Sequence, residues 1–221
     1  VAASVWADLG LSASSVPASE PLLHPRRYPW GPEHVGLAVS RSGTTTETLT
    51  ALKRAKAAGA ATIAVTTVQG SPMVNIADLT LVVSQGAESA TVQTRSFSSQ
   101  LMTVLAAAAQ VREPALLELL AQWLPGASLL VSRSEAAVKN LETDWDRAYF
   151  LGTGALIGIA QEGALKLKES ALTEAEAFQT LEFRHGPKSM VDDRTLIVGL
   201  LSNEAEEQEL RVMREMHEIG A

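Results

Sequence analysis

The fold of this chain is decided by the stretch His34-Val35-Gly36-Leu37-Ala38-Val39-Ser40-Arg41-Ser42-Gly43-Thr44-Thr45. Residues 34–39 form an apolar run that is typical of a buried strand, and residues 47–58 have the spacing of a helix. The free N–H groups that open a helix attract anions, and serine and threonine hydroxyls add further donors. Gly43 allows a ligand to approach the backbone closely. The loop therefore predicts a binding site for a phosphorylated small molecule.

The same loop has a second, plainer interpretation. Serine and threonine are common at helix N-caps and in turns, so the loop by itself leaves an ordinary capped turn equally open. It lacks the Gly-Lys-Ser/Thr ending of a nucleotide P-loop, and it is not a Gly-x-Gly-x-x-Gly loop. The choice between the two interpretations depends on the rest of the chain.

Strand-like runs alternate with helical patterns along the whole sequence. A short strand is expected at residues 12–18, and residues 112–145 are expected to be helical with a break at Pro125-Gly126. The other expected strands cover 61–67, 79–83, 148–151 and 195–201, and the other helices cover about 94–111, 155–169 and 204–219. Such alternation predicts an α/β fold, with parallel sheets covered by helices on both faces. Ligands of these sheets bind beyond the carboxyl ends of the strands, where Gly152-Thr153-Gly154 forms a second small-residue loop.

The composition narrows the class of protein. Of the 221 residues, 46% are hydrophobic and 19% are charged, which indicates a folded globular chain. A net charge of −7 argues against non-specific nucleic-acid binding and against an anionic membrane surface. The chain has no cysteine, which excludes disulfides and thiolate catalysis, and its four histidines suggest no metal cluster. No apolar run is expected to be long enough to span a bilayer, so we expect a cytoplasmic protein.

The ends of the sequence suggest a piece of a longer polypeptide. Residues 1–9 resemble the middle of a helix that ends at Gly10, and the chain has no initiator methionine. Its last residues, Ile219-Gly220-Ala221, resemble a helix end with nothing after it.

Two carboxylates mark the helix expected at 155–169. Glu162 and Glu169 are seven positions apart, so they differ by only about 20° in azimuth, and Lys166 lies between them on the same stripe. The plain interpretation is a solvated helix with ordinary ion pairs, each worth about 0.2–0.5 kcal/mol. His185 lies in a downstream loop, where a single histidine is more often incidental than catalytic.

Taken together, these segments resemble the SIS (sugar isomerase) domain family in its double-domain form. The motifs that carry the resemblance are Ser40–Thr45, Gly70-Ser71-Pro72, Ala77-Asp78, Glu88 with Thr94–Phe97 and Gln100-Leu101, Glu162–Glu169, and His185-Gly186-Pro187. The resemblance implies two flavodoxin-like SIS units, at residues 1–125 and 146–221, with a helical connector at 126–145. Both units would be truncated, the first at its N-terminal strand and the second at its C-terminal part.

The resemblance also implies roles for individual residues. Glu169 would be the base that moves a proton between C1 and C2 of the sugar, and His185 would assist ring opening, reaching the site of a neighbouring subunit in a homodimer. Glu162 and Lys166 would lie near the reactive end of the sugar. The phosphate would be held by Ser40, Arg41, Ser42, Gly43 and Thr45, and the sugar would also contact Thr91 and Gln93. No cofactor is implied.

Several functions within this resemblance stay open. The first expectation is a phosphosugar isomerase that acts on a hexose 6-phosphate, with an amino sugar and accompanying deamination favoured by Phe183–Ser189. The second is the isomerase half of the glutamine–fructose-6-phosphate aminotransferases, which form glucosamine 6-phosphate. The third is a sugar-phosphate sensor without turnover. The aminotransferases have Val-Ala-Ser-Thr-Lys in place of residues 91–95, and Arg41 replaces a glutamine, so the identity of the sugar is open.

Overall fold

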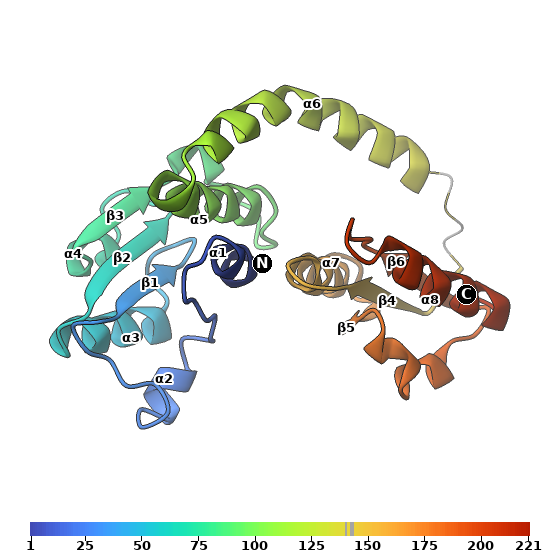
Figure 1. Cartoon of the computed structure of the whole chain (residues 1–221), viewed down its shortest axis with the longest axis horizontal. Helices are drawn as coiled ribbons and strands as arrows, with labels where there is room; N and C mark the ends of the chain where they lie inside the picture. Colours follow the sequence, from blue (N-terminus) through green and yellow to red (C-terminus); the bar gives the residue numbers. More distant parts are fainter. Residues whose placement is uncertain (140, 142–143) are drawn as a thin grey trace. The chain divides into compact units, whose positions relative to one another are not determined.

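The structure is a computed structural model that describes residues 1–139, 141 and 144–221. The chain divides into two compact units, which are drawn in Figure 1. The N-terminal unit consists of Leu9–Leu116 with Ala2, and the C-terminal unit consists of Leu117–Ala221 with Val1 and Ala3–Asp8. Residues 140, 142 and 143 of the expected connector lie outside the described residues.

The N-terminal unit is built on three parallel strands in the order β1-β2-β3. Helix α3 covers one face, where its Leu52 packs with Ala64 and Met73, while Gln100 of α5 donates from the other face to the Val65 carbonyl at 3.3 Å. The elements are α2 (Glu20–Leu23), β1 (Val35–Val39), α3 (Thr46–Ala57), β2 (Ala61–Thr66), α4 (Pro72–Ile76), β3 (Leu79–Val82), η1 (Ser84–Gly86) and α5 (Arg95–Arg112).

The C-terminal unit is built on three further parallel strands in the order β5-β4-β6. Alternate side chains of β4 point to opposite faces, so Ala148 packs toward α7 while Tyr149 and Leu151 pack with Phe183 and α8. The elements are α1 (Ala2–Asp8), α6 (Ala115–Val138), β4 (Arg147–Gly152), α7 (Leu156–Ala171), β5 (Glu174–Gln179), η2 (Glu182–Arg184), η3 (Pro187–Met190), β6 (Thr195–Gly199) and α8 (Glu206–Ile219).

The predicted fold class is confirmed, since both sheets are parallel and have helices on both faces. Two local predictions are wrong. Residues 12–18 form no strand, because this Ser- and Pro-containing segment makes no sheet pairing in the described structure. Strand β5 was not expected, although Glu174-Ala175-Glu176-Ala177 alternates with the period of a strand whose alanines face α7.

Helix α6 also differs from expectation. It runs without interruption through Pro125, although a break was predicted there. None of its residues is buried. By length and composition α6 could cross a membrane, which corrects the expectation that no apolar run is long enough. One helix of this kind does not by itself indicate a membrane protein.

Candidate active site

The predicted phosphate loop follows β1 and leads into α3, as the sequence indicated. The hydroxyl groups of the loop contact one another and so hold one another in place. Ser40 Oγ lies 3.1 Å from Thr45 Oγ1 and accepts the N–H of Gly43 at 3.2 Å, and Ser42 Oγ lies 2.8 Å from Thr44 Oγ1. The loop is therefore a preorganised turn rather than an extended segment, with its hydroxyls gathered at the start of a helix.

The carbonyl oxygens of this loop are turned toward the protein. Arg41 O accepts the hydroxyls of Thr66 and Thr67 at 2.9 and 3.0 Å, and Gly43 O accepts the N–H of Met73 at 3.1 Å. Because these acceptors are used internally, they do not oppose an anion. The first N–H groups of α3 have no intrahelical partner, which leaves donors for a phosphate.

Arg41 connects the loop to a second predicted part of the site. Its guanidinium Nη1 donates to Ala90 O at 2.7 Å and to Thr91 O at 3.4 Å. Arg41 therefore holds the segment that contains Thr91 and Gln93 beside the phosphate loop. The other donors of the guanidinium are not needed for this contact and could still bind an anion.

Glu88 organises the far end of that segment. Its carboxylate accepts the N–H groups of Thr94, Arg95 and Ser96 at 3.0–3.2 Å, and it also accepts the hydroxyls of Thr94 and Ser96. The pKa of Glu88 is lowered to about 2, first by the hydrogen bond from the Ser96 hydroxyl and then by the backbone donors. Desolvation acts in the opposite direction but is outweighed. At neutral pH an ionised carboxylate thus caps the start of α5.

The stripe on α7 forms an ion-paired cluster. Lys166 Nζ lies 2.5 Å from a carboxylate oxygen of Glu169 and 3.4 Å from one of Glu162. The side chains of Glu162 and Lys166 are only 18% and 21% exposed, and that of Glu169 is 39% exposed. The predicted common face of the three side chains is confirmed, and Glu162 and Lys166 are more shielded from solvent than residues on a fully solvated helix face.

Lys166 is held as a cation. Burial by itself would lower the pKa of Lys166. Its hydrogen bond to Glu169 and the charges of both carboxylates raise the pKa by more than burial lowers it, so the pKa lies above its ordinary value. At neutral pH the cluster therefore presents an ammonium group between two carboxylates. Such a group can stabilise negative charge that develops on a substrate oxygen.

His185 is exposed and follows the short helix η2. Its backbone N–H donates to Glu182 O at 2.9 Å, and the next residue, Gly186, has a φ of 127°. Two neighbours anchor the loop: Phe183 is fully buried, and Arg184 makes a two-pronged ion pair with Glu215 of α8 at 2.8 and 2.7 Å. The sequence analysis missed this clamp, because Glu215 is 31 positions away.

Within the C-terminal unit, Glu169 and His185 come from opposite faces of the sheet. Helix α7 packs on the face that contains Ala148, while the His185 loop is anchored through Phe183 on the face that contains Tyr149 and Leu151. The phosphate loop belongs to the other unit. The structure thus groups the predicted residues into three sets: the loop with residues 90–93, the α7 stripe, and the His185 loop.

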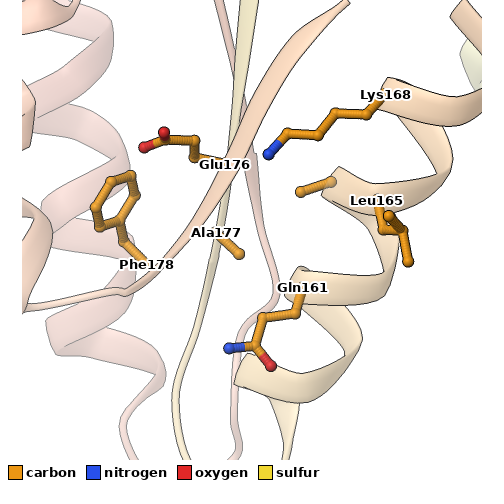
Figure 2. A pocket seen from close by; sticks show the side chains of 7 residues that line it. Gln161, Leu165, Lys168, Glu176, Ala177 and Phe178 are labelled. Carbon is orange, nitrogen blue, oxygen red and sulfur yellow. The ribbon is translucent and has the colours of Figure 1, made fainter. Parts of the chain in front are cut away.

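A surface hollow of about 360 Å³ lies on a different side of α7 and contains none of the predicted residues. Figure 2 shows that Lys168 and Gln161 extend from α7 toward β5, whereas Glu176 and Phe178 point away from the helix. The hollow is lined by Gln161, Ala164, Leu165, Lys168, Glu176, Ala177 and Phe178. Among the described residues, no group of three or more His, Asp or Glu side chains is arranged to hold a metal ion.

The two parallel sheets, the hydroxyl-rich loop and the glutamate–lysine stripe define a class of protein. The family model of the SIS domain matches residues 10–110 and 143–221, so this chain belongs to the SIS domain family.

The chain is similar to glutamine–fructose-6-phosphate aminotransferases (isomerizing). It is 35% identical over 186 residues to that of Pseudomonas putida, and 32% identical over 200 residues to that of Pyrobaculum aerophilum. These matches cover 78% and 86% of this chain but only 30% and 33% of the relatives, so the chain spans about a third of their length.

Among solved structures, glucosamine-6-phosphate deaminase from Thermotoga maritima is similar over the whole chain. The TM-score is 0.90 and the identity 29%, and the match covers 69% of that protein. Tagatose-6-phosphate ketose/aldose isomerase from Escherichia coli matches with a TM-score of 0.80 over 99% of this chain and 62% of the other, at 24% identity, which shows a shared fold.

Proposed function

We propose that this chain is the isomerase part of an enzyme that interconverts the aldose and ketose forms of a hexose 6-phosphate. The observation that carries the proposal is the Glu162–Lys166–Glu169 cluster, a half-buried set of charges that the fold does not need for its core. The hydroxyl-rich loop after β1 supplies a second requirement, an anion site. The names of the relatives, which concern hexose and hexosamine 6-phosphates, agree with this substrate class.

In this proposal the phosphate is bound by the loop Ser40–Thr45 and by the N-terminus of α3. Binding there is remote from the reacting carbons, so its free energy can be used to orient the substrate. Arg41 would contact the phosphate while keeping Thr91 and Gln93 beside the sugar, since its guanidinium already donates to residues 90 and 91.

Glu169 is the proposed base. Its carboxylate would take the proton from C2 of the open-chain aldose, leaving an enediolate whose negative charge lies on O1. It would then return that proton to C1 while the proton of the O2 hydroxyl moves to O1, which gives the ketose. A positioned carboxylate of this kind contributes about 10²–10⁴-fold to the rate. Lys166 would stabilise the negative charge that develops on the substrate oxygen, and Glu162 would fix the position of Lys166.

His185 is proposed to open the sugar ring in the site of a second copy of the chain. The support is geometric. Helix α7, which carries Glu169, and the His185 loop are anchored on opposite faces of the same sheet, so the packing of that sheet does not bring Glu169 and His185 together. A histidine ring can accept and donate a proton, so it can pass one to the ring oxygen. A homodimer follows from this proposal.

Two candidate functions differ in whether an amino group is removed from the sugar or added to it. Deamination of glucosamine 6-phosphate is favoured by the TM-score of 0.90 to a glucosamine-6-phosphate deaminase. The isomerase half of a glutamine-dependent aminotransferase is favoured by the identity of 35% to such enzymes over 186 residues. A sensor without turnover is a weaker candidate, because binding alone does not require the charged stripe on α7.

The test uses the full polypeptide that carries this chain. Glucosamine 6-phosphate is supplied, and ammonia and fructose 6-phosphate are measured for wild type, Glu169→Gln and the control Glu206→Gln, whose side chain is exposed on α8. We expect Glu169→Gln to lose about 10²–10⁴-fold in kcat while its calorimetric affinity for the substrate is largely kept. The control should match wild type.

The outcomes separate the candidates. Ammonia release by the wild type supports the deaminase, whereas amination of fructose 6-phosphate with glutamine supports the aminotransferase. Substrate binding without turnover in either assay would support the sensor. A wild-type rate for Glu169→Gln would remove this carboxylate from the role of base.

A further inference from the structure

The second small-residue loop, Gly152-Thr153-Gly154, does not contact the substrate in the proposed function. It ends β4 and leads into α7. In the order β5-β4-β6, the chain leaves β4 toward one side for β5 and then returns to the other side for β6. The carboxyl ends of β4 and β6 therefore flank a topological switch point, the place where open α/β sheets bind their ligands (Figure 1).

A protein carboxylate occupies this place. Glu209 of α8 is completely buried, and its Oε1 accepts the hydroxyl of Thr153 while its Oε2 accepts the N–H of Ser202 at 2.6 Å. Thr153 belongs to the loop after β4, and Ser202 belongs to the loop after β6. The donors of both loops are thus turned toward one internal anion.

The loop after β1 in the N-terminal unit is built differently. It also has hydroxyls and leads into a helix, but Ser40 and Thr45 contact each other, 3.1 Å apart, and not a carboxylate. Both loops join a strand to a helix, and Glu209 is the feature that distinguishes them.

We propose that Glu209 is a built-in anion that closes the switch-point site of the C-terminal unit, so that each chain offers a single phosphate site, in the N-terminal unit. The carboxylate takes the position of a ligand phosphate and joins the ends of β4 and β6. It also fixes the loop from which α7 begins, and it is therefore a positioning residue for the Glu162–Lys166–Glu169 stripe.

The experiment removes the internal anion and offers a replacement. Glu209→Ala is compared with wild type and with Glu206→Ala, an exposed glutamate one turn earlier on the same helix. We expect Glu209→Ala to lose roughly 5–10 °C in Tm, because buried donors on Thr153 and Ser202 are left without a partner. Sodium acetate or inorganic phosphate should then raise its Tm saturably, beyond the effect of sodium chloride at equal ionic strength.

Controls make the result specific. Wild type and Glu206→Ala should show no such anion-dependent rise beyond that of the loop after β1, and phosphate titration should give one site in wild type and two in Glu209→Ala. Glu209→Gln fills the same space without the charge, so it should lose Tm and show no rescue. If Glu209→Ala does not fold, the number of phosphates bound per wild-type chain and the Tm of Glu209→Gln still test the proposal.

Two results would overturn the proposal: two phosphates bound per wild-type chain, or equal anion effects on all variants. A wild type that binds no phosphate while acetate rescues Glu209→Ala would contradict the proposed function and leave the role of Glu209 intact.

Discussion

Replacing Gly43 with alanine gives the sharpest test of the phosphate loop. Gly43 has a φ of 64°, and an alanine Cβ would lie 2.1 Å from Ser71 Oγ and 2.6 Å from Ser71 Cβ. The left-handed backbone costs a non-glycine residue about 1–2 kcal/mol. Forcing a methyl group into packed surroundings adds about 1–3 kcal/mol. We expect Gly43→Ala to lower the free energy of unfolding by about 2–5 kcal/mol.

Gly70→Ala is the matched control. Gly70 has a φ of 73°, but nothing lies within 4 Å of the Cβ that alanine would add there. Gly70→Ala should therefore lower the free energy of unfolding only by the cost of the left-handed backbone, about 1–2 kcal/mol. The change in the unfolded chain is the same for both variants, so it cancels in their difference. Urea unfolding, followed by circular dichroism, measures both free energies.

A third variant identifies the cause of the difference. Ser71→Gly in the Gly43→Ala background removes both atoms that the new methyl group would meet most closely, so it should recover most of the steric cost. The phosphate affinity of Gly43→Ala should fall as well, because the loop must shift. Equal free energies for Gly43→Ala and Gly70→Ala, within about 0.5 kcal/mol, would refute the reasoning.

Three further predictions concern other contacts. Glu88→Gln should be less stable than wild type at pH 7, and the difference in stability should disappear as the pH falls from about 4.5 to about 2. The reason is that Glu88, whose pKa is lowered, stabilises the fold only while its carboxylate is ionised. A constant difference across acid denaturation curves would contradict this. Gly152→Ala should reduce Tm and kcat together, since its Cβ would lie 2.8 Å from the backbone oxygen of Leu156 at the start of α7, and an unchanged Tm would count against that contact. Arg184→Lys should change stability by less than about 1 kcal/mol but speed hydrogen exchange around residue 185, because lysine cannot make the two-pronged pair with Glu215; unchanged exchange would show that Phe183 alone anchors the loop.

Much of the fold was predictable because its signals are local. The strand–loop–helix at residues 35–57 combines an apolar run, small hydroxyl residues and helical spacing, and each of these depends on neighbours in the sequence. The common face of Glu162 and Glu169 follows from helix geometry alone. Strand β5 was missed because glutamates alternate with alanines there, which weakens the apolar signal.

The site was predictable only in part. The loop, the stripe on α7 and the motif that joins Glu88 to residues 94–97 could be recognised, whereas the contact of Arg41 depends on a segment that local patterns do not connect to it. Arg41 donates to a carbonyl 49 positions away. The pair of Arg184 and Glu215 has the same character, since it joins a loop to a helix on one face of the sheet.

The sequence by itself determined the class of fold, the hydroxyl-rich turn between β1 and α3 and the shared face of the α7 charges, because helix and strand periods and turn-forming residues are properties of short segments. The order of the strands was decided only by the tertiary structure. That order placed Glu209 between the loops after β4 and β6, and it placed α7 and the His185 loop on opposite faces. The physical reason is that burial and long-range hydrogen bonds depend on which strands become neighbours, and no local pattern contains that information.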